Sequence, residues 1–384
     1  MRVNLLIDME MNYRNNLGSL WNLDADASAT CYYTKYPFSL DQDFTPASLS
    51  NIKDSVLQYF FKLWGCSSKD AFGFFSNTYQ DALFNIFQTA RNALGCNAEF
   101  FFCSKECDVC IADIARLLGM EVILVDCDSS GAMDVKSLGN LLKVYAPSII
   151  VADKRLIVHL DIGSSNMGAI DDIDKICDTL EGFRITKRQY FMHCGAFIHG
   201  FILPFTISDF LSMGAKDCID AISCSPSAFL GLSIHSGIVV MRDKYKGAHY
   251  RTFQPPVNGI IPLNIWECLC QKNNSVLRKE ALDCIKTAKS CHDYISKLGM
   301  KSVYNNYSNI VVLDLGVKID DNVKEFLEKY KLTVIMHDSS GVKRTRLVFM
   351  QHACKDSIFE ELMNDLLVLK TCMGFSTNNT AITK

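Results

Sequence analysis

Short apolar, β-branched runs alternate with helical patterns through the middle of the chain. Such runs predict buried strands, and apolar residues spaced three and four apart predict amphipathic helices between them. The predicted strands are Glu121–Asp126, Ser148–Ala152, Leu156–Asp161, Gln189–His193, Asp220–Cys224 and Ile234–Met241, and the predicted helices are Val135–Val144 and Asp171–Leu180. Strands that alternate with helices indicate an α/β fold with a mostly parallel sheet covered on both faces.

The pattern changes after Gln254. One long helical stretch, broken near Asn273, comes first, and shorter strands and helices follow it. The predicted elements are the helix Asn264–Ile295, the strands Ile310–Leu315, Thr333–Met336 and Thr345–Met350, and the helices Asp321–Lys331 and Asp356–Leu369. This order is typical of an α+β domain.

Composition limits the function classes. The 384 residues are 49% hydrophobic and 21% charged, and the net charge is −3 without long basic or acidic blocks. Nucleic acid and membrane surfaces therefore have no electrostatic basis as partners. No apolar run has the length of a bilayer-spanning helix or a signal peptide. The 17 cysteines are scattered through apolar segments, as free cysteines in a reducing compartment would be, and we expect a cytoplasmic protein.

Three cysteines, Cys103, Cys107 and Cys110, have the spacing C-x3-C-x2-C. This spacing holds an iron–sulfur cluster in radical enzymes, because three thiolates on one loop bind three irons. The same segment also fits the end of a strand followed by a helix, and in a cysteine-rich chain we favour that structural interpretation. We expect no metal site.

Histidines and serines give no motif by spacing alone. His159 lies within a predicted strand, and His193 and His199 are six residues apart without a carboxylate or histidine at ligand spacing. No G-x-S-x-G sequence is present. A Ser–His–Asp arrangement formed in three dimensions stays open.

Several blocks, in order and with matching spacing, resemble the group II decarboxylases that use pyridoxal phosphate (PLP), in particular the plant histidine and serine decarboxylases. Asp161–Ile173 resembles N-I-G-T-T-x-x-G-A-x-D-D-I, and His193–Phe205 resembles H-C-D-G-A-x-x-G-x-x-x-P-F. Ser223–Gly231 resembles S-x-S-G-H-K-F-x-G, and Tyr36–Asp41 resembles Y-P-x-N-L-D. The resemblance covers about residues 36–369.

The resemblance implies the fold of a fold type I PLP-dependent transferase. It implies a large, mostly parallel sheet domain at 40–254 and a smaller α+β C-terminal domain at 255–370, with an N-terminal segment at 1–39 and a tail at 371–384. Because the family's active site lies at a dimer interface, it also implies a homodimer or a heterodimer with an active paralogue.

The chain departs from the family at the positions that hold the cofactor. The family's Schiff-base lysine and the histidine before it correspond to Ala228 and Ser227. The aspartate that pairs with the pyridine nitrogen corresponds to Gly195, and the histidine that stacks on the ring corresponds to Asp108. Tyr79 and Gln80 replace the Gly-Thr pair of the phosphate loop. The segment at 45–56 is also shorter than the family's substrate entrance.

These departures remove the chemistry that the resemblance implies. Alanine has no amine to hold PLP covalently, and a ring nitrogen without a carboxylate is a weaker electron sink. We therefore predict a non-catalytic homologue (a pseudoenzyme) with no PLP, serving as an interaction or regulatory protein. The alternative is an active PLP-dependent amino-acid decarboxylase with an unorthodox site, which requires a replacement lysine. Lys216 and Lys105 are the candidates that the neighbouring sequence offers, and neither is obviously placed for it.

Overall fold

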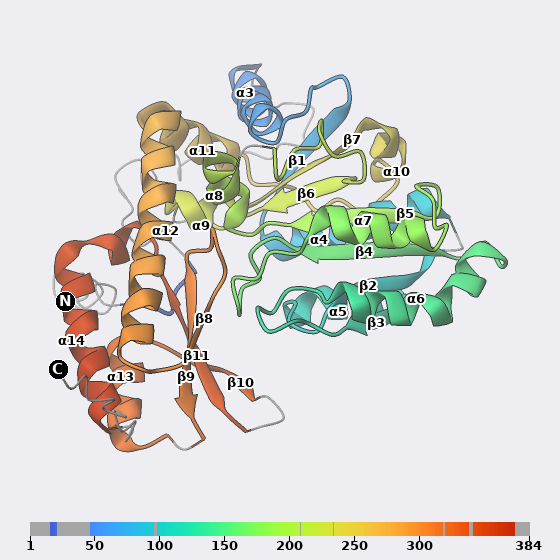
Figure 1. The fold of residues 1–384 in the computed structure, drawn as a ribbon. Coiled ribbons are helices and arrows are strands. Elements are labelled where there is room, and N and C mark those ends of the chain that lie inside the picture. Colours follow the sequence, from blue (N-terminus) through green and yellow to red (C-terminus); the bar gives the residue numbers. More distant parts are fainter. Residues whose placement is uncertain are drawn as a thin grey trace. The chain divides into compact units, whose positions relative to one another are not determined.

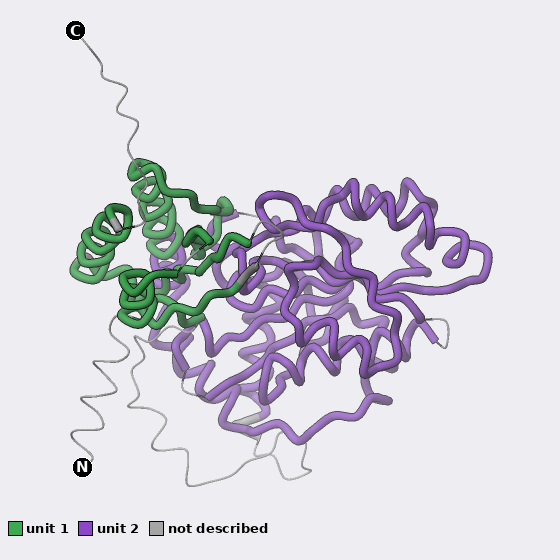
Figure 2. Tube along the Cα trace, turned by 90° about the horizontal axis from the view of Figure 1, so that it is seen from below, with its two compact units in different colours: residues 1–23, 283–384 green, residues 24–282 purple. Residues whose placement is uncertain are grey.

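A computed structural model describes residues 16–20, 47–95, 98–207, 209–232, 234–317, 319–337 and 341–372. Contacts divide the chain into two compact units, residues 24–282 and residues 1–23 with 283–384, which Figure 2 colours separately. The predicted match at Tyr36–Asp41, the first 15 residues and most of the tail lie outside the described residues.

The larger unit alternates strands with helices, as the sequence pattern predicts (Figure 1). Its elements are α3 (Ala47–Leu63), β1 (Ala71–Ser76), α4 (Tyr79–Leu94), β2 (Ala98–Ser104), α5 (Val109–Leu117), β3 (Glu121–Val125), α6 (Val135–Ile150), β4 (Arg155–Asp161), α7 (Ile173–Gly182), β5 (Tyr190–Gly195), α8 (His199–Thr206), β6 (Ala221–Cys224), α9 (Pro226–Leu230), β7 (Gly237–Arg242), η1 (Asp243–Tyr245), α10 (Lys246–His249) and α11 (Ile260–Gln271). The next helix, α12 (Asn274–Lys297), contains the boundary between the units.

The seven-stranded sheet of this unit has the order β1-β7-β6-β5-β4-β2-β3. The pairs from β6 through β5, β4 and β2 to β3 are parallel. Strand β7 is antiparallel to both of its neighbours, β6 and β1. The sheet is therefore mostly parallel, and β1 and β3 are its edge strands. The α/β fold of the fold type I class, predicted from the resemblance, is confirmed.

One predicted strand is wrong. Residues 148–152 do not form a strand, because helix α6 continues to Ile150. The buried residues of α6 are Leu138, Leu142, Ala146 and Ile149, which recur at helical spacing and cover one face. Pro147 lies inside the helix. The apolar run at its end was therefore the last turn of an amphipathic helix and not a separate strand.

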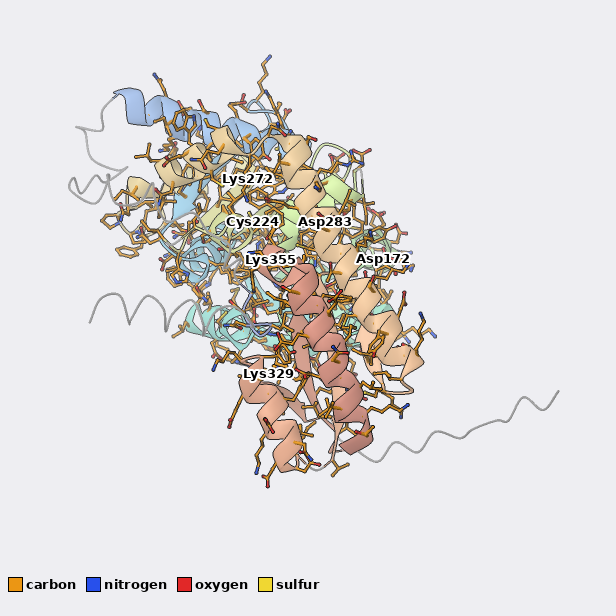
Figure 3. All side chains as sticks on the ribbon, turned by 90° about the vertical axis from the view of Figure 1, so that its left-hand side faces the viewer. Asp172, Cys224, Lys272, Asp283, Lys329 and Lys355 are labelled. Atoms are coloured by element: carbon orange, nitrogen blue, oxygen red, sulfur yellow. The ribbon has the colours of Figure 1, made fainter. Side chains whose placement is uncertain are left out.

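The smaller unit contains a four-stranded sheet of order β10-β11-β9-β8, in which every pair is antiparallel. Its elements are β8 (Ser302–Tyr304), β9 (Ile310–Gly316), α13 (Asp321–Lys329), β10 (Val334–His337), β11 (Lys343–Val348), η2 (Gln351–Cys354) and α14 (Asp356–Cys372). Lys329 on α13, which Figure 3 labels, forms ion pairs with Glu361 and Asp365 on α14. The predicted α+β character is confirmed, and β8 is an additional short strand.

The contact-based division falls after Leu282, inside α12. The domain boundary predicted after Gln254 stays a prediction. The predicted break near Asn273 is confirmed, because α11 ends at Gln271 and α12 begins at Asn274. No helix among the described residues has both the length and the apolar character needed to cross a membrane.

Candidate functional site

The candidate site lies where the parallel strands β4, β5 and β6 end. Asp161, Gly195 and Ser223 are register partners across these three strands, and His159 is the partner of His193 one step earlier. Side chains two residues apart on a strand point to the same face of a sheet. The strand pairing therefore places His159, Asp161, His193 and Ser223 on one face, with a glycine among them.

These side chains form a continuous hydrogen-bonded chain. The hydroxyl groups of Ser223 and Tyr79 are 3.1 Å apart, and Ser223 Oγ lies 2.8 Å from His193 Nε2. The chain continues to His159 through a contact of 2.9 Å between the two Nδ1 atoms. His159 Nε2 lies 3.3 Å from Asp161 Oδ1, and the hydroxyl of Ser104 donates to Asp161 Oδ2 at 3.0 Å. Together these side chains form the polar chain: Tyr79, Ser223, His193, His159, Asp161 and Ser104.

The histidines of the polar chain have complementary proton positions. Burial, and then the neighbouring His159, holds the pKa of His193 well below its usual value, so His193 is neutral. A hydrogen bond between two Nδ1 atoms requires one ring to donate there and the other to accept. If His159 accepts at Nδ1, its Nε2–H faces the Asp161 carboxylate, and His193 Nε2 accepts from the Ser223 hydroxyl. This arrangement satisfies both rings.

A hydroxyl, two imidazoles and a carboxylate in sequence can activate a nucleophile when the hydroxyl meets a substrate. In this protein Ser223, His193 and His159 have no exposed surface, and Asp161 is 6% exposed. The Ser–His–Asp arrangement that the sequence left open is thus formed, with a second histidine inserted, but inside the core. Its contacts are those of a buried polar network that stabilises the fold.

Helix α4 brings Tyr79 to the polar chain. The Thr78 hydroxyl accepts from the backbone N–H of Asp81 and caps the helix, so α4 starts at Tyr79. The Tyr79 side chain is buried, and burial raises the pKa of its hydroxyl well above the usual value. Gln80, the next residue, is exposed. In the family a Gly-Thr pair stands at these two positions. Tyr79 here directs a bulky, protonated phenol into the interior.

Gly195 shows how tightly the polar chain fills this region. A Cβ atom built on Gly195 would lie 2.6 Å from His159 Cε1 and 3.1 Å from the Tyr79 hydroxyl oxygen. Real Cβ atoms do not approach other atoms as closely as 2.6 Å. The volume that a side chain at 195 would need is therefore occupied by His159 and Tyr79.

Ala228 and Ser227 lie on the short helix α9, directly after β6, and both are fully buried. Ser227 Oγ accepts from the backbone N–H of Ser236 at 3.2 Å and lies 3.1 Å from Ser225 Oγ. Ser225 in turn donates to the Ser236 carbonyl. Ser227 thus ties the helix to the chain entering β7. Ala228 contributes a methyl group to the core and has no group that could react.

Asp108, at the family's ring-stacking position, is the N-cap residue of α5. Its Oδ2 accepts from the Ser165 hydroxyl at 2.6 Å. Ser165 belongs to the Asp161–Ile173 block and follows β4 directly. The contact between Asp108 and this block is therefore a polar one. The positions Tyr79, Asp108, Gly195 and Ala228, which the resemblance singled out, therefore lie at or shortly after the carboxyl ends of β1, β2, β5 and β6, respectively.

Asp171 connects two backbone segments next to this site, one at Met133 and one at Asp161. Its two carboxyl oxygens accept, each at 2.7 Å, from the backbone N–H groups of Met133 and Asp161. Burial, and then the charge of Asp161, raises the pKa of Asp171 to about 8, although the two N–H groups favour the ionised form. Sequence reasoning matched Asp171 to the family block but did not assign it this role.

His199 is buried without hydrogen bonds. Neither of its ring nitrogens has a partner among the described residues, and burial lowers its pKa to about 4. The ring packs against Gly163, where an added Cβ would lie 1.9 Å from His199 Nδ1. His199 is therefore a core residue and not a ligand.

The lysines considered as replacements are engaged elsewhere. Lys216 forms an ion pair with Asp174, and Lys105 forms one with Asp126. Cys103 and Cys107 are buried, and Cys110 is half-buried on α5. Among the described residues, no three His, Cys, Asp or Glu side chains are grouped so that they could hold a metal ion.

Comparison with solved structures defines the fold. The solved structures with similar folds include L-methionine decarboxylase from Streptomyces sp. 590 (TM-score 0.78, 16% identity, 96% of this chain and 94% of that one). They also include Lactobacillus brevis glutamate decarboxylase (TM-score 0.78, 12% identity, 98% and 92%). At these identities the similarity defines the fold, which is that of the PLP-dependent decarboxylases.

Sequence comparison finds similar proteins among the decarboxylases. Residues 92–256 match the pyridoxal-dependent decarboxylase conserved domain. Histidine decarboxylase of Solanum lycopersicum is 27% identical over 269 residues, covering 68% of this chain and 63% of that protein. Serine decarboxylase 1 of Oryza sativa subsp. japonica is 23% identical over 336 residues, covering 79% and 65%. The chain thus spans slightly less than two thirds of these plant relatives. Over the matched residues it is similar to the group II PLP-dependent decarboxylases.

The residues at the family's cofactor positions do not fit PLP. Ala228 provides no amine, and the region beside Gly195 is filled by His159 and Tyr79. Asp161, one strand away, carries a carboxylate, but both of its oxygens are hydrogen-bonded within the polar chain.

Proposed function

We propose that the protein is a pseudoenzyme of the PLP-dependent histidine and serine decarboxylases that acts as an interaction or regulatory protein. The observation that carries this proposal is the contact at Gly195, where the missing side chain is replaced by a neighbouring histidine. A lost lysine alone would leave a pocket. A filled site indicates that the core has repacked around the losses.

The surroundings of Ala228 support the same proposal. Its position is fully buried, and Ser225 and Ser227 beside it are engaged with Ser236. A lysine reaching the site from another element would need a path through packed side chains. Neither Lys105 nor Lys216 is free for this, since each is paired with an aspartate.

Carbon dioxide release tests this proposal. Purified protein, supplied with PLP and either histidine or serine, should release no more carbon dioxide than a heat-denatured sample. A histidine decarboxylase assayed in parallel shows that the assay works. Turnover above the denatured control would favour the alternative, an active decarboxylase with an unorthodox site.

We also propose that the protein forms a homodimer or a heterodimer with an active paralogue, because an interaction protein needs a surface for its partner. Helix α11 offers Trp266, which is 38% exposed, with half-buried Leu263 and Leu269 beside it. Ile265, predicted to belong to this face, is fully buried within the chain. Sedimentation at micromolar concentration should give a dimer. A monomer, both alone and mixed with the paralogue, would contradict the proposal.

A cytoplasmic location remains part of the proposal. It is supported by the described cysteines, which are free and mostly buried or half-buried. Such thiols are typical of a reducing compartment.

A further inference from the structure

A cavity of about 330 Å³ lies in the smaller unit, between α12 on one side and η2 with the start of α14 on the other. Its α12 wall consists of residues at helical spacing, which share one side of that helix. The lining residues are Asp283 (labelled in Figure 3), Lys286, Thr287 and Ser290 on α12, Cys354 at the end of η2, and Phe359 on α14. Cys354 is half-buried, so part of its surface is accessible where it borders this cavity.

A second thiol adjoins Cys354. Cys284 lies on α12, is fully buried, and forms a hydrogen bond with the thiol of Cys354. The backbone N–H of Cys354 donates to the Met350 carbonyl at 3.1 Å, which fixes the end of η2 facing α12. Both cysteines are free. The smaller unit therefore contains two neighbouring thiols on different elements, one at a cavity and one behind it in the core.

The hydrogen bond between the two thiols favours the thiolate form of Cys354. Donation from the Cys284 thiol lowers the pKa of Cys354 below its usual value, although burial and the charge of Asp283 act in the opposite direction. The Thr287 hydroxyl donates to the Asp283 carbonyl at 2.9 Å, so Cys284 is the main donor to Cys354. Because the thiolate is the nucleophilic form of cysteine, Cys354 is the attacking thiol of the pair, and Cys284 is the one that keeps its proton.

We propose that Cys354 is a site of oxidation by hydrogen peroxide and that Cys284 converts the product to a disulfide. In the first step the Cys354 thiolate attacks one peroxide oxygen, the O–O bond breaks, a sulfenic acid forms on Cys354, and hydroxide leaves. In the second step the Cys284 sulfur attacks the Cys354 sulfur, the S–O bond breaks, and the hydroxyl group leaves as water with the Cys284 proton. In total the two thiols lose two electrons and two protons, and the peroxide is reduced to two waters.

The position of Cys284 favours an internal disulfide over a product with an outside thiol. Cys284 is shielded from peroxide by its burial, yet it adjoins the sulfur that becomes the sulfenic acid. The disulfide links α12 to η2 inside the smaller unit, and thiol exchange in a reducing compartment reverses it. The cavity and the polar chain share no residue. The inference therefore stands or fails independently of the proposed loss of catalysis.

Peptide mapping of the oxidised full chain tests the proposal. The reduced protein is treated with an equimolar amount of hydrogen peroxide, its remaining thiols are blocked with N-ethylmaleimide, and an unreduced digest is analysed by mass spectrometry. We expect a cross-linked peptide pair that contains Cys284 and Cys354 and that dithiothreitol separates. Cys284→Ala should instead leave a sulfenic acid on Cys354, which dimedone labels. This acid should form about threefold more slowly, because an about tenfold loss of thiolate is partly offset by its higher intrinsic nucleophilicity.

Two other cysteines serve as controls. Cys291→Ala, two turns further along α12 and also fully buried, should form the cross-link as the wild type does. Cys270 on α11 is exposed and should be oxidised more slowly than Cys354. Absence of the cross-link between Cys284 and Cys354, or oxidation of Cys270 before Cys354, overturns the proposal. Both readings come from the wild-type protein, so they decide the question even if Cys284→Ala does not fold.

Discussion

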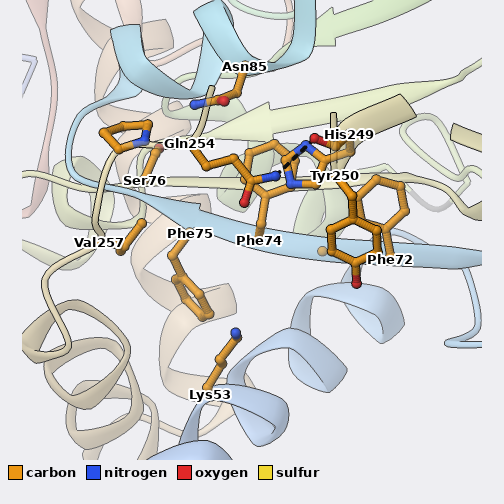
Figure 4. Close-up of a pocket in the computed structure, with 12 residues that line it drawn as sticks. Lys53, Phe72, Phe74, Phe75, Ser76, Asn85, His249, Tyr250, Gln254 and Val257 are labelled. Atoms are coloured by element: carbon orange, nitrogen blue, oxygen red, sulfur yellow. Dashed lines mark hydrogen bonds between the residues drawn. The ribbon is translucent and has the colours of Figure 1, made fainter. Parts of the chain in front are cut away.

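The polar chain and the cavity at β1 contrast in what they contain and in what can reach them. The polar chain contains a hydroxyl, two imidazoles and a carboxylate, all of the kinds that take part in catalysis, but its members are 0–8% exposed. The cavity, a space of about 170 Å³ at the free edge of β1, is lined mainly by aromatic and amide groups (Figure 4). Reactive groups and accessible space are thus separated. In a working active site they coincide.

A substitution at Gly195 tests most directly whether the region around the polar chain is filled. Gly195→Asp restores the family residue, but it would drive a side chain into His159 and place a second carboxylate beside Asp161. We expect the free energy of unfolding to fall by about 3 kcal/mol or more, as for other buried, unpaired charges and overpacked cores. Urea denaturation followed by circular dichroism measures the change.

Gly182→Ala is the matched control for that substitution. A Cβ at Gly182 meets nothing within 4 Å, so this variant should be neutral or slightly stabilising. If Gly195→Asp were as stable as the wild type, the region would have room for the family's aspartate. The description of a filled site would then be wrong.

The buried His199 should make the stability of the protein depend on pH. Its pKa in the folded protein, about 4, lies below the unfolded value of 6.5, so the folded state binds its proton less readily. The contribution of His199 to stability is fully present above pH 6.5 and is lost as pH falls toward 4. His199→Leu should be neutral or stabilising by about 1 kcal/mol at pH 7, because it removes two unpaired buried nitrogens.

The difference in free energy of unfolding between His199→Leu and the wild type should grow by about 3 kcal/mol between pH 7 and pH 4, since one pKa unit corresponds to about 1.36 kcal/mol. Denaturation curves of both proteins across this range provide the measurement. A difference between them that does not change with pH would mean that His199 has a partner or is protonated in the folded state.

Ala228→Lys should have the smallest effect on activity, namely none. The substitution returns an amine to α9, but it leaves His159 and Tyr79 in place of the ring-nitrogen carboxylate and the phosphate loop. Residues that act as one site are strongly non-additive. Assays with histidine, serine and aromatic amino acids should therefore give no carbon dioxide above background, whereas release from any of them would show that the site is largely intact.

The fold was predictable where pattern and resemblance agreed. Strands β3, β4, β5 and β6 lie close to the predicted ranges, because buried parallel strands give continuous apolar runs. The strand predicted at 148–152 was wrong, since a short apolar run cannot by itself distinguish a strand from the end of a buried helix. The edge strand β1 was not among the predicted strands.

The sequence predicted which of the family's cofactor residues are missing from the candidate site. It did not predict which side chains occupy their place. Ala228, Gly195 and Tyr79 could be read as substitutions because each stands inside a matched block. The hydrogen bond between His159 and His193 depends on the register of β4 against β5. Local residue spacing does not encode this register. The one available signal was that His159 and Asp161, and likewise His193 and Gly195, are two residues apart on predicted strands and so share a face.

The most direct test of the account is the reaction of the purified protein with PLP and borohydride. We predict no visible absorption band from a lysine adduct after dialysis against PLP. After borohydride reduction, we predict no peptide in which one lysine carries the pyridoxyl group in stoichiometric amount. Tomato histidine decarboxylase treated in the same way serves as the comparison. Stoichiometric labelling of a single lysine in this chain would contradict the central claim that its cofactor site has been lost.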